Sequence, residues 1–431
     1  MKESLIHKLK ASDIAKRMTR GAFWSLTGTA LGKFCILLAG IFCARILGQE
    51  GFGELGMVRS TIGMFIVMGS AGIGVTATRF ISQYRESDKA YTAAIYTLSN
   101  KFALVVGIMI ACILLCVSSP IAVYALHEPE LQLSVQIGCL ILLASILNAA
   151  QQGVLTGLED FRSIAINTFI ASIIEALLTT AGAWLWGVEG AIAGFGLGII
   201  VLWLANLRSV RIDFMKAGIH PAGKMIGKES RHLLIDYCLP ATLSALTVTP
   251  AFFLIRSMLV SDSGYNELAI YEAADQWKVI ILFIPSAISN IALPILSSMN
   301  KQQTFERTLM ANILLVGGIA TLVAILISLL SANIMPLYGS DFNNQLPLIL
   351  LAVSTVFSSI ATVIEMAIYS KDKMWPCLWM NLLWAILMVG CCYLLLQRGY
   401  GAAAPAWAVL ISYLLKAAYM GVYIRMINET D

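Results

Sequence analysis

The sequence has 431 residues, of which 58% are hydrophobic and 13% are charged, and its formal net charge is +4. Soluble domains carry about a quarter charged residues, so this composition excludes an ordinary soluble protein. The positive charge gives no reason to invoke nucleic acid, because basic residues between apolar runs orient a membrane protein and contact anionic lipid headgroups.

Twelve apolar runs follow one another along the chain. A helix rises about 1.5 Å per residue, so about 20 residues cross the hydrocarbon core of a bilayer. The runs cover residues 22–45, 54–78, 91–118, 132–157, 163–185, 188–208, 232–259, 267–297, 308–330, 345–370, 374–397 and 400–424. The sequence therefore predicts an all-α polytopic membrane protein with about 12 transmembrane helices.

Lysine and arginine gather in one alternating set of loops, above all at the N-terminus and in the central connection between Arg208 and Arg231. Short basic loops stay on the cytoplasmic side, so both termini are predicted to be cytoplasmic. The predicted organisation is a basic cytoplasmic segment (1–20), an N-terminal six-helix bundle (21–208), a basic cytoplasmic linker (209–231), and a C-terminal six-helix bundle with a short tail (232–431).

A faint internal repeat supports this division. The stretch "LGQEGFGELGMVRS" (47–60) aligns with "VSDSGYNELAIYEA" (260–273), which pairs Glu54 with Glu267 and Arg59 with Glu272. Two bundles in the same orientation form a parallel pseudo-repeat about an axis along the membrane normal. Transporters of this kind bind substrate between the bundles and expose it alternately to each side of the membrane.

Ionisable residues inside the apolar runs are the candidate site residues, because such groups are costly in a bilayer and usually face a cavity or a partner. Lys33, Glu175, Asp275 and Lys278 lie deep in their runs. Arg59 and Glu272, at matching depths, suggest a salt bridge between the bundles, although both lie close enough to the interface to snorkel. The candidate cavity cations are Lys33, Arg45, Arg59, Arg256 and Lys278, and the candidate coupling or gating carboxylates are Glu175, Glu272, Asp275 and Glu365.

The nine cysteines lie in or beside apolar runs, and the four histidines lie in loops or at helix ends. This distribution favours packing over a disulfide framework or a metal site, so no metal and no cofactor are predicted. The outer loops are short and no histidine lies deep in a run, which disfavours catalysis by a membrane glycosyl polymerase or acyltransferase. The protein is predicted not to be an enzyme.

Three stretches resemble one known family: "RGAFWSLTGTALGKF", "ARILGQEGFGELGMVRS" and "LPILSSM". They are similar to the polysaccharide transporter family, the Wzx-type flippases of the multidrug/oligosaccharidyl-lipid/polysaccharide exporter superfamily. The resemblance implies a multi-pass protein of the bacterial inner membrane. It also implies movement of undecaprenyl-diphosphate-linked oligosaccharide repeat units to the outer leaflet by alternating access, for O-antigen, capsule or exopolysaccharide synthesis.

Under this resemblance the partners are the lipid-linked oligosaccharide and the bilayer, with a polysaccharide polymerase and a chain-length regulator as candidate protein partners. The basic excess among the buried charges suits a diphosphate headgroup. A multidrug or small-solute ion-coupled exporter of the same superfamily is the alternative. Coupling to protons, to sodium or to the membrane potential stays open.

Overall fold

The structure is a computed structural model that describes residues 2–219, 239–283, 285–286, 288, 302–371 and 373–430. Its long elements are helices, in chain order α1 (Lys2–Tyr84), α2 (Lys89–Pro120), α3 (Gln132–Gly157), α4 (Phe161–Ala217), α6 (Leu239–Ile281), α8 (Gln302–Ile334), α9 (Leu346–Tyr369), α10 (Met374–Leu396) and α11 (Ala403–Thr430). Short helical turns lie at Ile121–Ala125, Pro129–Leu131 and Met335–Leu337.

Eight described segments are long and apolar enough to cross a membrane: Thr27–Ser70, Lys89–Ala125, Pro129–Gly157, Phe161–Ala217, Phe305–Leu337, Leu346–Tyr369, Trp375–Leu396 and Ala403–Met426. Their outward faces are apolar, as a lipid-facing surface requires; on α8, for example, Leu314, Leu322 and Leu329 recur about every two turns and are exposed. The prediction of an all-helical, multi-pass membrane protein is therefore confirmed.

Three of the long helices contain a sharp break. The backbone leaves helical geometry at Gly48 in α1, at Trp186 and Gly187 in α4, and at Gly264 in α6. The three glycines have positive φ angles of 73°, 61° and 81°, which glycine adopts without the steric cost of a Cβ. Each break falls between two apolar runs of the sequence.

At two breaks, contacts show that the chain turns back on itself. In α4, Gly182 packs against Gly190 and Leu178 packs against Gly194, so positions equally far from Trp186 meet. In α6, Arg256 reaches Glu272 and Asp275 across Gly264. Each helix is therefore an antiparallel hairpin in space.

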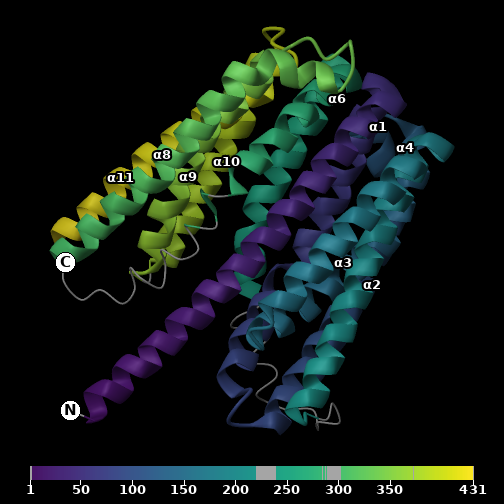
Figure 1. Cartoon of the computed structure of the whole chain (residues 1–431). Helices are drawn as coiled ribbons and strands as arrows, with labels where there is room; N and C mark the ends of the chain where they lie inside the picture. Colours follow the sequence, from purple (N-terminus) through teal and green to yellow (C-terminus); the bar gives the residue numbers. More distant parts are fainter. Residues whose placement is uncertain are drawn as a thin grey trace.

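The helices form two groups (Figure 1). Helices α1–α4 pack on one another, as do α8–α11, and α6 lies between the groups, against α1 on one side and against α9 and α10 on the other. The first nine residues of the predicted linker, 209–217, continue α4, whereas residues 220–231 lie outside the described residues. The seventh and eighth predicted runs are described only in part.

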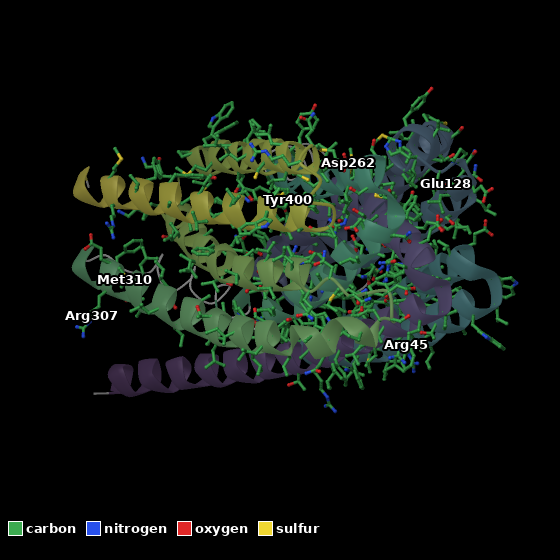
Figure 2. The ribbon with its side chains drawn as sticks, turned by 90° about the horizontal axis from the view of Figure 1, so that it is seen from above. Arg45, Glu128, Asp262, Arg307, Met310 and Tyr400 are labelled. Atoms are coloured by element: carbon green, nitrogen blue, oxygen red, sulfur yellow. The ribbon has the colours of Figure 1, made fainter. Side chains whose placement is uncertain are left out.

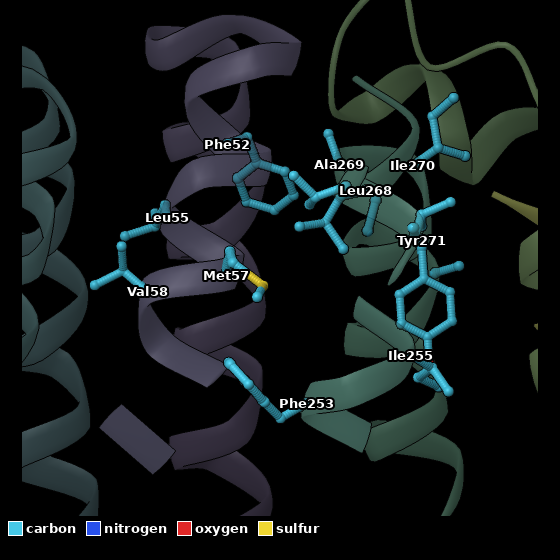
Figure 3. Packing of buried hydrophobic residues seen from close by; sticks show 14 of the residues in the cluster. Phe52, Leu55, Met57, Val58, Phe253, Ile255, Leu268, Ala269, Ile270 and Tyr271 are labelled. Atoms are coloured by element: carbon cyan, nitrogen blue, oxygen red, sulfur yellow. The ribbon is translucent and has the colours of Figure 1, made fainter. Parts of the chain in front are cut away.

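The hydrophobic core is continuous at one end of the molecule and divided at the other. One cluster joins both groups around the breaks at Gly48 and Gly264, and Figure 3 shows Phe52 and Met57 of α1 facing Leu268 of α6 within it. At the other end, one cluster belongs to α8–α11 and a separate one to α1–α4. The end with the joint cluster is called the closed end below.

Candidate functional site: a charged cavity between α1 and α6

A cavity of about 490 Å³ lies between α1 and α6. Phe52, Leu55 and Phe252 supply apolar lining, and Gln276 is one of the neutral polar groups. The charged residues in the lining are Lys33, Arg59, Arg256 and Glu272. Because α1 supplies one wall and α6 the other, any movement of α6 against α1 changes the shape of the cavity.

Arg59 is held by the N-terminal helix group. Its Nη2 donates to Oε1 of Glu175 on α4 at 3.3 Å, and its guanidinium lies over the ring of Phe195, 4.3 Å from the centroid. The arginine side chain is 25% exposed and that of Glu175 is 13% exposed. The pair is therefore half-buried, with the arginine on the cavity side.

The α6 hairpin carries a denser ionic cluster. Nε of Arg256 donates to Glu272 at 2.5 Å and its Nη2 donates to Asp275 at 3.0 Å, while Lys278 pairs with the other oxygen of Asp275. The Lys278 ammonium also lies over the Phe252 ring, 4.6 Å from the centroid. All four charged side chains are at most 14% exposed, so each charge is compensated by a neighbour rather than by water.

Lys33 differs from the other cavity cations. It is half-buried on α1, and within the described part of the chain it makes no hydrogen bond or ion pair. Among the described residues, therefore, no carboxylate compensates the charge of the Lys33 ammonium.

The salt bridge suggested between Arg59 and Glu272 is not formed in this structure. Arg59 pairs instead with Glu175 inside the N-terminal helix group, and Glu272 pairs with Arg256 inside α6. The hairpin at Gly264 explains this choice, because it brings Arg256 opposite Glu272 on the adjacent arm of the same element.

Arg45 and Glu365, two further predicted site residues, lie away from the cavity lining. Arg45 is exposed near the closed end, where its Nε donates to the carbonyl of Leu337 at 2.6 Å. Figure 2 shows Arg45 and Asp262 toward one end of the helices and Arg307 toward the other. Glu365 lies on α9 inside the C-terminal helix group.

Lys416 is a buried charge that the sequence reasoning missed. Its Nζ donates to Oε2 of Glu365 at 3.0 Å, and the hydroxyl of Tyr369 and the amide of Asn381 donate to Oε1 at 2.9 and 2.8 Å. The sequence places this lysine inside the last apolar run, in "AVLISYLLKAAYMGVY". The rule that intramembrane charges mark partners or cavities would have selected it.

Contacts between the groups close the cavity at one end. The rings of Tyr338 and Phe342, which follow α8, lie 5.9 and 6.1 Å from the ring of Phe52 on α1. On the other side, the hydroxyls of Ser257 and Tyr265 on α6 donate to carbonyls at the end of the α2 segment, Ala125 and Leu126, at 2.6 and 2.5 Å.

The site offers side chains that can bind an anion. Within the residues that the structure describes, no three His, Cys, Asp or Glu side chains lie together as metal ligands would. Cations with apolar surroundings, accessible from a cavity between two movable walls, can hold an anionic headgroup and release it when the walls separate.

The model of one protein family, described as "Polysaccharide biosynthesis protein", matches residues 18–300. The chain belongs to the polysaccharide biosynthesis protein family. This assignment confirms the resemblance seen in the sequence motifs.

Relatives of this chain include polysaccharide export proteins and a flippase. The EPS I polysaccharide export inner membrane protein EpsE of Ralstonia solanacearum is 22% identical over 90% of this chain and 89% of its own length. The match to EpsE of Ralstonia nicotianae is 24% identical and covers 65% of each chain. The lipid III flippase of Escherichia coli is 22% identical over 69% of this chain and 71% of its own.

Among solved structures, the inward-facing conformation of a multidrug resistance MATE family transporter of the MOP superfamily superposes with a TM-score of 0.77. It covers 95% of this chain and 98% of its own, at 18% identity. The fold of this polysaccharide biosynthesis family member is therefore that of the MOP superfamily transporters.

Proposed function

We propose that the protein is a flippase that moves oligosaccharide repeat units linked to undecaprenyl diphosphate across the bacterial inner membrane, for the synthesis of a cell-surface polysaccharide. The observation that carries this proposal is the cavity between α1 and α6, in which Lys33 has no described anionic partner and Arg59 and Arg256 share the lining. A diphosphate is a dianion, and Lys and Arg bind it through charge-assisted hydrogen bonds.

Relatives support the same substrate class. EpsE is a polysaccharide export protein of the inner membrane, and the Escherichia coli relative is a flippase for lipid III. The flippase is a transporter and not an enzyme. An exporter of organic cations is less well supported, because the charged lining of the cavity is three cations and one carboxylate.

The proposed topology has twelve spans in two six-helix bundles, residues 21–208 and 232–431, joined by the basic linker 209–231. The breaks in α1, α4 and α6 support it, since each divides one long helix into two arms. The basic residues support cytoplasmic termini and a cytoplasmic segment 1–20. Alternating access would then be a movement of one bundle against the other around the cavity.

Roles remain proposed for the individual side chains. Lys33 and Arg59 bind the headgroup from the cavity wall, and Arg256 and Lys278, each paired with a carboxylate of α6, add positive charge beside it. Arg45 acts at the closed end rather than in the cavity. The carboxylates Glu175, Glu272, Asp275 and Glu365 are candidates for coupling or gating, and a polymerase and a chain-length regulator are candidate partners.

Transport of a fluorescent undecaprenyl-diphospho-oligosaccharide in liposomes tests the proposal, with an impermeant quencher reporting the exposed leaflet. Wild-type protein is expected to move the label between leaflets faster than protein-free liposomes. Lys33→Gln removes a charge-assisted contact and is expected to slow the exchange about tenfold. Lys101→Gln, a matched change at an exposed position on α2 outside the cavity, is expected to leave it unchanged. No exchange above protein-free liposomes would refute the proposed function.

A further inference from the structure

The two cavity arginines are held with very different strength. Arg256 is 9% exposed and pairs with two carboxylates, Glu272 and Asp275. Arg59 is 25% exposed and makes one 3.3 Å contact with one carboxylate oxygen. A guanidinium has five N–H donors, so most of those of Arg59 are uncommitted within the described residues.

Glu175 depends on Arg59 alone. In the described part of the chain it has no other ion pair, and it packs against Gly198 on the opposite arm of the α4 hairpin. The adjacent helix α3 carries no charged residue. Glu175 itself is absent from the cavity lining, whereas Arg59 is part of it.

The charges in and around the cavity nearly cancel. The four cations Lys33, Arg59, Arg256 and Lys278 face the three carboxylates Glu175, Glu272 and Asp275, which leaves one net positive charge, on Lys33. A diphosphate diester carries two negative charges. Lys33 supplies one matching charge, and a second cation becomes available to the headgroup only by release from its internal partner.

The geometry favours Arg59 as that cation. Residues on both sides of the break at Gly48 line this cavity, so the two arms of α1 lie side by side there. Lys33 lies 15 residues before Gly48 and Arg59 lies 11 residues after it, so the two differ by about 6 Å in height along the arms at 1.5 Å per residue. A diphosphate held between two flexible side chains can span this difference in height. Phe195 supports the face of the guanidinium, which can exchange its edge partner without moving far.

We propose that Glu175 is an internal competitor of the substrate: the diphosphate displaces it from Arg59 on binding, and it recaptures Arg59 to drive release. This inference rests on the proposed function and assigns Glu175 a role within it. A buried carboxylate without its partner is costly, so the displaced Glu175 stores part of the binding energy and returns it when the headgroup leaves.

Binding of a short-chain prenyl-diphospho-N-acetylglucosamine to the full protein in nanodiscs tests the inference. Glu175→Gln is expected to bind this probe about tenfold more tightly than wild type, because about 1.4 kcal/mol of competition corresponds to that factor. The same variant is expected to move the fluorescent substrate between leaflets more slowly than wild type, since release loses its driving contact. A prenyl-N-acetylglucosamine without the diphosphate is expected to show no gain in affinity.

Two control variants separate this effect from others. Glu189→Gln removes the same charge from an exposed position on α4 and is expected to leave the affinity for the probe at the wild-type value. In an Arg59→Gln background, Glu175→Gln is expected to add no affinity, because no cation is left to release; that double variant buries no unpaired charge and is expected to fold.

An affinity of Glu175→Gln that equals or falls below the wild-type value would overturn the inference, as would an equal gain with and without Arg59. If the proposed function itself were wrong, the wild-type protein would bind the diphosphate probe and the probe without diphosphate with equal affinity.

Discussion

At the residue scale, the number of partners decides what a buried charge can do. Arg256 is enclosed by two carboxylates, whereas Arg59 has one partner and Lys33 has none within the described residues. An arginine with two buried carboxylates keeps its place, because breaking either contact exposes a charge to a medium that cannot solvate it. The loosely held and unpaired cations are the ones that a ligand can recruit.

The pair Lys416–Glu365 is expected to act mainly on stability. Both side chains are nearly buried, and Glu365 is also an acceptor for Tyr369 and Asn381. Lys416→Met is expected to destabilise the folded protein by about 3–5 kcal/mol, because it leaves a buried carboxylate without its cation. Thermal unfolding of the purified protein in detergent measures this loss.

Adding Glu365→Gln to Lys416→Met removes the stranded charge and is expected to recover most of the lost stability. If the double variant unfolded at a lower temperature than Lys416→Met alone, the loss would not come from an uncompensated carboxylate.

At the element scale, close backbone approach shapes the α4 hairpin. An ideal Cβ on Gly190 would lie 2.2 Å from the carbonyl oxygen of Gly182, and one on Gly194 would lie 2.3 Å from that of Leu178. Small residues allow such approach between membrane helices. The same hairpin fixes Glu175 against Gly198 and so places its carboxylate toward Arg59.

Gly190→Ala is therefore expected to destabilise the protein by about 1–3 kcal/mol, because the two arms must separate to admit a methyl group. Gly318→Ala is the matched control, since an added Cβ there meets nothing within 4 Å and alanine gains up to about 1 kcal/mol in helix propensity. Melting temperatures of the two variants measure the difference. A Gly190→Ala protein as stable as Gly318→Ala would show that the arms do not need this contact.

At the scale of the whole molecule, the two helix groups are joined at the closed end and have separate hydrophobic clusters at the other. Among the contacts of this joint are an aromatic group around Phe52 and hydrogen bonds such as the one from Gln49 to the carbonyl of Asp341 at 3.4 Å. These contacts lie between the groups, so they can open without unfolding either group.

Spin labels at positions 49 and 341, in a background without native cysteines, are expected to report this opening. The short distance should dominate in the resting protein, and a second, longer population should emerge during transport of the lipid-linked substrate. Electron–electron distance measurements in liposomes detect both populations. A single short distance under active transport would exclude opening at this end. Labels at positions 31 and 46, both exposed on the first arm of α1, serve as the invariant control.

Much of this architecture could be predicted from the amino-acid order, because lipid imposes a simple rule. Apolar runs of about 20 residues must be helical, so the helices and the breaks between them follow from composition and glycine positions. The same rule selected the charged candidates, and four of them, Lys33, Arg59, Arg256 and Glu272, line the cavity, whereas three of the four that lie deepest in their runs, Glu175, Asp275 and Lys278, are absent from the lining.

The sequence alone could not determine which buried charged side chains form ion pairs with one another. The depth of Arg59 and of Glu272 follows from their positions in the chain, but their partners depend on how the arms of α1, α4 and α6 rotate and pack. Lys416 and Glu365 are 51 residues apart and meet only because α9 and α11 pack together. Length and hydrophobicity along the chain determined the solvent and the helices, whereas the pairing of buried charges was decided by tertiary packing, because electrostatic contact depends on distances between elements that no local pattern records.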